Sequence, residues 1–148
     1  MIVTKSHIEE TLKKNGLKIT KTRFSTLKAL YELNHPSVED IVQYLFLADI
    51  KTTVQSVYNN LELYEELNII KKIATNGSSM RYDIHSHNHC HIHMNDSNEV
   101  NDYHDQELMD LIENHFKNKK ITDLNIKSID VIITAKEAPT NNISNNLI

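Results

Sequence analysis

The chain has 148 residues, with 16 Lys and Arg, 20 Asp and Glu, and a formal net charge of −4. This length fits one domain or two small ones, and the acidic total excludes a generally basic nucleic-acid coat protein while allowing a DNA binder with one local basic face. The charge is uneven, because residues 1–84 hold 11 basic and 10 acidic side chains whereas residues 85–148 hold 5 and 10. We therefore expect two units with different partners.

Cysteine content and hydropathy limit the class of protein further. Cys90 is the only cysteine, which excludes an internal disulfide framework and any four-cysteine zinc site within one chain. No apolar run approaches the roughly 20 residues that a membrane-spanning helix needs. The first ten residues lack the apolar segment of a signal peptide. A cytoplasmic protein without a membrane partner is expected.

Four helices are predicted in the first half of the chain from apolar spacing and end signals. The signals are Asn15-Gly16 at the end of the first helix, Thr20 or Thr22 as cap of the second, Ser37 as cap of the third, Thr52 or Thr53 at the start of the fourth, and Asn68 at its end. The fourth helix has an apolar face formed by Val54, Val57, Leu61, Tyr64 and Leu67.

A β-hairpin is predicted next, because two short extended runs flank Asn76-Gly77. Three helices followed by a hairpin is the order of a winged helix-turn-helix. The fourth helix is then the recognition helix, and the hairpin is the wing.

The second half is predicted to have the order β-β-α-β. Strands are expected within residues 85–94, 99–104 and 126–134, and a helix over 105–118. The apolar face of that helix is predicted to hold Leu108, Leu111, Ile112 and His115 or Phe116. The fold class is α+β, with a winged-helix domain at 1–84, a small α/β domain at 85–137, and a polar, Asn-rich tail at 138–148 that is expected to be disordered.

Histidine is the unusual feature of the composition. There are nine, and five alternate along one segment: His85, His87, His89, His91 and His93. Alternate side chains of a strand point to one face, and a buried imidazole needs partners. Metal binding is therefore favoured over a polar, solvent-facing strand. Imidazole with carboxylate suits Zn, Fe, Ni, Cu or Mn.

Spacing alone does not choose the ligands of such a site. The candidate carboxylates near the histidine segment are Asp83, Asp96 and Asp102, and His35 is a further candidate. Cys90 would point to the opposite face of the strand, so we expect a packed thiol and not a ligand.

Four segments, in order, resemble the ferric uptake regulator (Fur) superfamily over about residues 12–134. They are GLKITKTRFSTLKAL (16–30), HPSVEDIVQYL (35–45), TTVQSVYNNLELYEELNIIKK (52–72) and SSMRYDIHSHNHCH (78–91). The resemblance implies that residues 85–137 form a dimerisation and metal-sensing domain. It also implies a homodimer that binds a palindromic double-stranded DNA operator.

The resemblance is closest to the peroxide-responsive branch of the family, and it implies a regulatory metal site. The implied ligands are His35, Asp83, His89, His91 and Asp102. Asp at position 102 favours this branch, because iron- and zinc-sensing relatives commonly place Glu there. The set of three imidazoles and two carboxylates fits Fe(II) or Mn(II), with Zn possible in vitro. The implied function is a repressor that senses peroxide through metal-catalysed oxidation of His35 or His89.

One departure from the family is clear. Most members bind a structural zinc through two Cys-x-x-Cys pairs, but the first pair falls on Met94 and Ser97 here, and the second has no cysteine. A four-cysteine structural zinc is therefore excluded, and the second domain must be held by packing and dimer contacts.

Candidate DNA contacts follow from the predicted winged helix and the resemblance. Lys18 and Arg23 are placed to meet phosphate or the minor groove. The exposed side of the recognition helix is expected to present Gln55, Ser56, Tyr58 and Asn59, of which Gln and Asn suit adenine readout.

Three alternatives to a peroxide-sensing repressor stay open. They are an iron- or zinc-sufficiency repressor of the same fold, a His-rich metal buffer, and a small metalloenzyme. No additional candidate base or substrate pocket supports an enzyme, so none is expected. Accessory or solvated roles are expected for His85, His87, His93 and His104.

Overall fold

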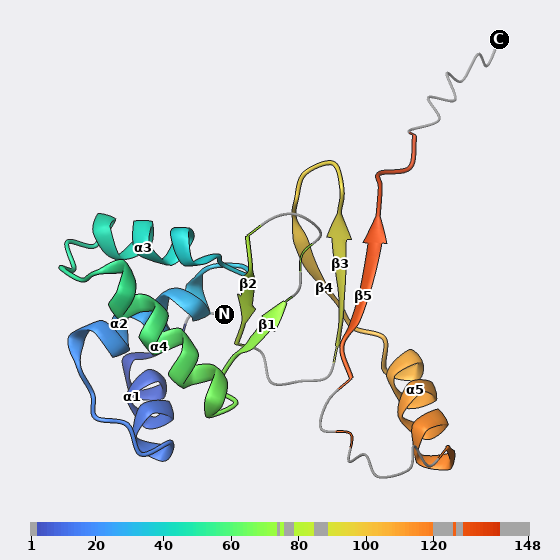
Figure 1. The fold of residues 1–148 in the computed structure, drawn as a ribbon, viewed down its shortest axis with the longest axis horizontal. Helices are drawn as coiled ribbons and strands as arrows, with labels where there is room; N and C mark the ends of the chain where they lie inside the picture. Colours follow the sequence, from blue (N-terminus) through green and yellow to red (C-terminus); the bar gives the residue numbers. More distant parts are fainter. Residues whose placement is uncertain are drawn as a thin grey trace. The chain divides into compact units, whose positions relative to one another are not determined.

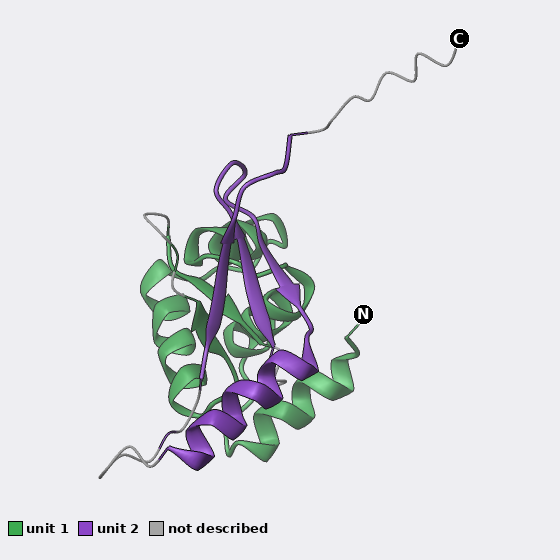
Figure 2. Cartoon of the chain, turned by 90° about the vertical axis from the view of Figure 1, so that its right-hand side faces the viewer, with its two compact units in different colours: residues 1–88 green, residues 89–148 purple. Residues whose placement is uncertain are grey.

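The computed structural model describes residues 3–73, 75, 79–84, 89–119, 126 and 129–139. The chain divides into two compact units, residues 1–88 and residues 89–148 (Figure 2), called unit 1 and unit 2 below. The predicted domain boundary after residue 84 stays a prediction. Residues 85–88, which include His85 and His87, lie outside the described residues, as does the predicted tail from residue 140 onward.

Unit 1 contains four helices followed by a hairpin (Figure 1), as the sequence predicts. The helices are α1 (Lys5–Lys14), α2 (Lys21–Glu32), α3 (Val38–Leu47) and α4 (Val54–Glu66). Each begins after a hydroxyl side chain that accepts a hydrogen bond from a backbone N–H in the first turn. The caps are Thr4, Thr20, Ser37 and Thr53.

The core of unit 1 is mostly apolar, and the hydroxyl of its largest fully buried side chain, Tyr64, has a hydrogen-bond partner. Val57, Leu61 and Tyr64 of α4 are buried, as predicted, and the Tyr64 hydroxyl donates to the Arg23 carbonyl oxygen at 2.8 Å. Burial raises the pKa of Tyr64. The prediction was wrong for Val54, which is 52% exposed. Val54 is the first residue of its helix and lies ahead of the packed segment.

The hairpin of unit 1 joins β1 (Lys71–Ile73) and β2 (Arg81–Asp83), which pair antiparallel with Lys71 opposite Asp83. The predicted turn at Asn76-Gly77 lies outside the described residues. The hairpin is tied to the start of α3 by a further bridge between Ser37 and Arg81. In this bridge the Tyr82 N–H donates to the carbonyl oxygen of Pro36 at 3.0 Å.

Unit 2 has the predicted order β-β-α-β. Its elements are β3 (Cys90–Met94), β4 (Val100–Tyr103), α5 (Gln106–Asn118) and β5 (Val131–Ala135). The strand order is β4-β3-β5, with β4 antiparallel and β5 parallel to β3. The prediction placed the last strand too early. The strand begins at Val131, which pairs with Cys90, the first residue of β3.

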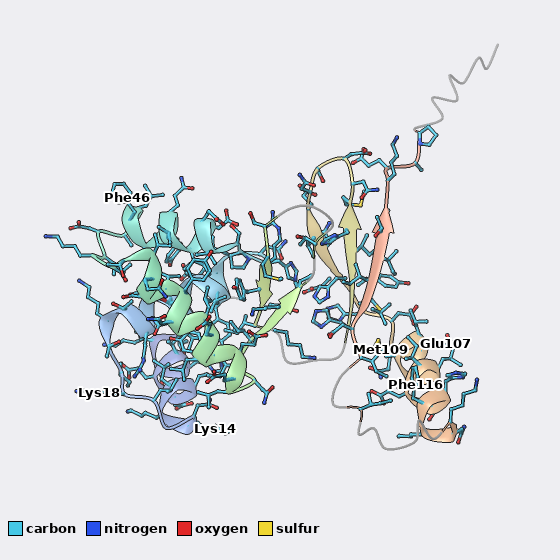
Figure 3. All side chains as sticks on the ribbon, in the orientation of Figure 1. Lys14, Lys18, Phe46, Glu107, Met109 and Phe116 are labelled. Carbon is cyan, nitrogen blue, oxygen red and sulfur yellow. The ribbon has the colours of Figure 1, made fainter. Side chains whose placement is uncertain are left out.

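Helix α5 contacts the unit 2 sheet through Met109 (labelled in Figure 3), whose Sδ atom lies 3.8 Å from Cys90 Sγ on β3. Met109 is buried, while Leu111 is 63% exposed, so the predicted helix face was wrong at Leu111. Two residues correspond to about 200° around a helix, so Leu111 points away when Met109 points inward. Leu108, Ile112 and Phe116 are half-buried. Among the described residues no helix is long and apolar enough to cross a membrane.

Candidate metal centre and nucleic-acid interface

Unit 1 brings together His35 and Asp83, two of the five predicted metal ligands. An isolated antiparallel bridge joins Ser37 to Arg81, and His35 and Asp83 each lie two residues from this bridge. Both side chains are buried, and their candidate ligand atoms lie within 4.8 Å of each other. The start of α3 and the end of the wing therefore form the unit 1 half-site.

The backbone at His35 is held in an uncommon conformation. Its φ of 45° lies in the left-handed region, although Pro36 follows and disfavours helical conformations for the preceding residue. Arg81 holds this turn, because its Nη1 donates to the His35 carbonyl oxygen at 2.9 Å. Arg81 also lies 3.7 Å from the Asp40 carboxylate. Such strain persists only where surrounding contacts fix it, and it is concentrated at functional sites.

Unit 2 brings together His89, His91 and Asp102, the other three predicted ligands. His91 is directly opposite Asp102 in the β3–β4 register. Asp102 Oδ1 lies 3.0 Å from His89 Nε2 and 3.4 Å from His91 Nε2. The two Nε2 atoms are 3.1 Å apart. His89 and His91 are buried, and Asp102 is partly exposed. These three side chains are the unit 2 half-site.

The chemistry of these donors fits a divalent first-row metal. Each half-site combines imidazole nitrogen with carboxylate oxygen, the mixture that suits Fe(II), Mn(II) and Zn(II). In unit 2, two imidazole nitrogens and one carboxylate oxygen converge within 3.4 Å. Buried imidazoles that point at each other are satisfied by a shared proton or by a shared cation, and three convergent donors favour the cation.

Other predicted candidates lie outside these half-sites. Asp96 is exposed in the turn after β3. Cys90 is on the face opposite the histidines, against Met109, as expected for a packed thiol. Burial and the nearby Asp105 carboxylate raise the pKa of the Cys90 thiol, which keeps it protonated and a poor ligand. His104 is exposed, with its ring centroid 5.2 Å from that of His89.

Sequence reasoning did not identify Arg81 as a site residue. Its role depends on the bridge between the hairpin and the residue after Pro36, a contact across 46 positions of the chain. The signal that could have found it is its place in the Arg-Tyr-Asp segment, two residues before Asp83. A charged donor so close to a candidate ligand is a typical supporting residue.

The predicted recognition helix presents polar groups on its exposed side. Gln55, Tyr58 and Asn59 are exposed, and Gln55 Nε2 donates to Asn59 Oδ1 at 2.9 Å. Ser56 is half-buried and accepts a hydrogen bond from the Thr53 hydroxyl at 3.0 Å, so its side chain also serves the helix cap. Gln55, Tyr58 and Asn59 are therefore exposed to solvent, and Ser56 only partly.

The two predicted basic contacts lie next to each other. Lys18 is exposed in the linker between α1 and α2 (Figure 3). Arg23 Nη1 donates to the Lys18 carbonyl oxygen at 3.1 Å, which leaves the other guanidinium nitrogens for further partners. This arrangement forms a small basic corner beside α2.

A winged-helix unit, followed by a small sheet unit and bearing clustered His and Asp, defines a metal-dependent DNA-binding regulator. The chain belongs to the ferric uptake regulator family, whose model matches residues 14–131. Membership places it among transcription regulators and not among enzymes. With Cys90 as its only cysteine, this sequence cannot form a four-cysteine zinc site.

Two curated relatives are peroxide-responsive repressors of staphylococci. The protein of Staphylococcus saprophyticus is 32% identical over 99 residues, which are 66% of this chain and 67% of the relative. The protein of Staphylococcus aureus strain Mu50 is 34% identical over 83 residues, 55% of this chain and 56% of the relative. The matches thus cover about two thirds or less of the relatives' lengths.

Solved structures give the same fold. The ferric uptake regulator of Helicobacter pylori superposes with a TM-score of 0.72 and 28% identity, covering 90% of this chain and 91% of that one. The regulator of Pseudomonas aeruginosa, solved with manganese, superposes with a TM-score of 0.73 and 22% identity, covering 87% and 96%. The second likeness concerns the fold alone.

Proposed function

We propose that one divalent cation is bound jointly by the two half-sites and that the protein is a repressor that responds to peroxide. The ligands are His35, Asp83, His89, His91 and Asp102. The observation that carries the proposal is the convergence of imidazole and carboxylate donors within each unit, with two donors in unit 1 and three in unit 2. Each set alone is smaller than the five or six ligands that Fe(II) and Mn(II) commonly take.

A site divided in this way couples cation binding to DNA binding. His35 and Asp83 belong to the unit that carries α4, and the other three ligands belong to the unit 2 sheet. A cation bound to all five selects one arrangement of the two units. It shifts the conformational equilibrium only by its differential affinity for that arrangement.

We propose a homodimer on a palindromic DNA operator as the working form. Among the described strands β5 pairs with β3 only, so its outer edge can accept another strand. Ile132 on this strand is 39% exposed. A two-fold dimer presents two copies of α4 to half-sites one or more helical turns apart. Gln55, Ser56, Tyr58 and Asn59 would contact base edges or the backbone, and Lys18 and Arg23 the phosphates.

Fe(II) held by these residues would activate peroxide, the two-electron oxidant, so that one peroxide oxygen enters an adjacent imidazole to give 2-oxo-histidine and the other leaves as water. The surrounding residues would hold the ligand side chains in position. Arg81 and Pro36 fix His35, and the β3–β4 register fixes His91 against Asp102. His35 and His89 are the candidates for oxidation, and loss of either imidazole removes a ligand and weakens the link between the units.

A second candidate function is a metal-sufficiency repressor of the same fold, responding to iron or zinc. The donor set favours it equally, since three imidazoles and two carboxylates accept Fe(II), Mn(II) and Zn(II). It differs from the first proposal only in the signal. Mass spectrometry distinguishes the two after brief exposure of the Fe(II)-loaded protein to peroxide, with operator binding followed in parallel and a Mn(II)-loaded control.

Peroxide sensing predicts a gain of one oxygen on His35 or His89 together with loss of operator binding, and neither change with Mn(II). If the histidines stay unmodified while operator binding simply follows the metal concentration, the metal-sufficiency function replaces it.

A further inference from the structure

His93 is a buried histidine on the same face of β3 as the unit 2 half-site. It follows His91 by two residues, and side chains two apart in a strand point to one face. The side chain is 7% exposed. Within the part of the chain that the structure describes, its Nε2 atom has no hydrogen-bond partner. A buried polar atom without a partner destabilises the fold, because it has lost its hydrogen bonds to water.

The strand register gives Asp102 two histidine neighbours besides His91. Asp102 is opposite His91, and Val100 is opposite His93. His89 and His93, each two residues from His91 along β3, are therefore the two diagonal neighbours of Asp102 on this face. Long side chains reach diagonal neighbours across a strand pair. His89 does so, with its Nε2 3.0 Å from Asp102 Oδ1. On the other diagonal, the Nε2 atom of His93 has no hydrogen-bond partner among the described residues.

The pair His91 and His93 repeats the spacing of the pair His89 and His91. Cα atoms two residues apart in a strand are about 6.6 Å apart, yet the Nε2 atoms of His89 and His91 are 3.1 Å apart. The approach comes from the side-chain torsions. A rotation of His93 about χ1 and χ2 brings its Nε2 toward His91 in the same manner.

We propose that His93 is an alternate metal ligand. With His91 and Asp102 it forms a second set of two imidazoles and one carboxylate, which binds a divalent first-row cation when the imidazole of His89 is lost. The inference rests on the proposed function, because it requires that the unit 2 half-site binds a cation. The second set has the same donor types as the first, so it suits the same cations. Binding also gives the His93 Nε2 atom a partner.

The test is a double-mutant cycle on Mn(II) affinity of the full-length protein, with free Mn(II) measured by electron paramagnetic resonance. The variants are His89→Ala, His93→Ala, the double variant H89A/H93A, and the matched control H89A/H104A. Removing His93 is expected to weaken Mn(II) binding by about tenfold or more in the H89A background. In the wild-type background the same change is expected to weaken it by less than about threefold, an interaction that independent sites do not show.

H89A/H104A is expected to bind like H89A. His104 is exposed and its ring centroid lies 5.2 Å from that of His89, so this control removes another imidazole close to the half-site. If H89A/H104A loses affinity and H89A/H93A does not, the alternate ligand is not His93 and the proposal is overturned.

A direct readout covers the case in which the double variant is poorly folded. Histidine labelled with ¹⁵N in the H89A protein is titrated with Zn(II), a diamagnetic probe of the same donor set. The Nε2 resonance of His93 is expected to move on Zn(II) addition in H89A and to stay in place in the wild type. A His93 resonance that does not respond in H89A overturns the proposal.

Failure of the inference is distinguishable from failure of the proposed function. Asp102→Asn removes the carboxylate that both donor sets share. If the wild type does not bind Mn(II), or if Asp102→Asn binds it as tightly as the wild type, both proposals fail. If those two proteins behave as expected while H89A/H93A binds Mn(II) as H89A does, only the role of His93 is lost.

Discussion

Arg81 donates a hydrogen bond from Nη1 to the carbonyl oxygen of His35 over 2.9 Å. The donor lies at the start of β2 and the acceptor at the turn before α3, so one side chain joins the wing to a candidate ligand of the metal. The bond acts on the backbone of His35, which has a φ of 45°. Arg81 therefore holds the backbone that carries the His35 imidazole, and we predict that it orients this imidazole without being a ligand.

Replacement of this arginine tests that role. Arg81→Ala is expected to weaken Mn(II) binding by about tenfold or more, because residues that orient metal ligands typically contribute 10- to 100-fold. Titration of Mn(II) measures the effect. The matched control is Lys72→Ala, which removes the same charge from the adjacent strand, where Lys72 pairs with Glu65 at 2.8 Å. Equal affinities for the two variants would contradict an orienting role for Arg81.

The left-handed backbone of His35 predicts that a glycine variant at this position is more stable than an alanine variant. Glycine adopts the left-handed region without the Cβ penalty of about 1–2 kcal/mol. His35→Gly is therefore expected to have a larger free energy of unfolding than His35→Ala, by about 1 kcal/mol, while both lose the imidazole and bind Mn(II) equally weakly. Urea denaturation of the metal-free proteins gives the comparison. An alanine variant as stable as the glycine variant would mean that the turn relaxes.

The recognition helix can be separated from the metal site by mutation. The double variant Tyr58→Ala with Asn59→Ala is expected to reduce operator affinity by about 100-fold, since each lost base or stacking contact contributes about 1–3 kcal/mol. Mn(II) affinity should not change. Phe46→Ala is the matched control, because Phe46 is an aromatic side chain on α3 that is 78% exposed (Figure 3). Fluorescence anisotropy with labelled operator DNA reports the affinities. A buffer or an enzyme would bind no operator in any of these forms.

The Cys90 thiol is predicted to be unreactive in the folded protein. Burial and the Asp105 carboxylate raise its pKa, so at about pH 8 the folded thiol stays protonated when the unfolded thiol begins to ionise. Reaction with a disulfide reagent should be about 100-fold slower than in denaturant, corresponding to an opening free energy of about 3 kcal/mol.

The pH dependence of stability follows in sign from the same shift. A pKa raised in the folded state stabilises the fold below the unfolded pKa, and this contribution is lost as the pH rises through the folded pKa. Cys90→Ala is therefore expected to show less loss of unfolding free energy above about pH 8.5 than the wild type. Identical pH profiles for the two proteins would show that the thiol ionises equally in both states.

Much of the fold could be predicted from local signals. Ser37 and Thr53 are good caps whatever surrounds them, and helical spacing of apolar residues predicted the buried face of α4. Local signals did not predict which residues of a helix are buried where contacts with another element determine the buried face. Met109 is the buried residue of α5 because it meets Cys90, and nothing within the helix distinguishes it from Leu111.

The candidate site shows the same division. The alternation of histidines at period two predicted a common strand face, and His89 and His91 share one. The proximity of His35 and Asp83 depends on the pairing of Ser37 with Arg81, a long-range contact that no short window contains. The family resemblance named those two residues, but only the fold supplies the reason that they meet.

The length of the turn between β3 and β4 determines which side chains of β4 face the histidines of β3. Residues 95–99 connect the two strands, with Asn98 at a φ of 55°, and this length places Asp102 across from His91. One residue inserted here would slide β4 by a single position and turn the Asp102 carboxylate to the face of Met109, since strand faces alternate. Asn101 or Tyr103 would then face the histidines. Variation in this turn is therefore constrained to changes that preserve its parity, even though none of its side chains is a proposed ligand.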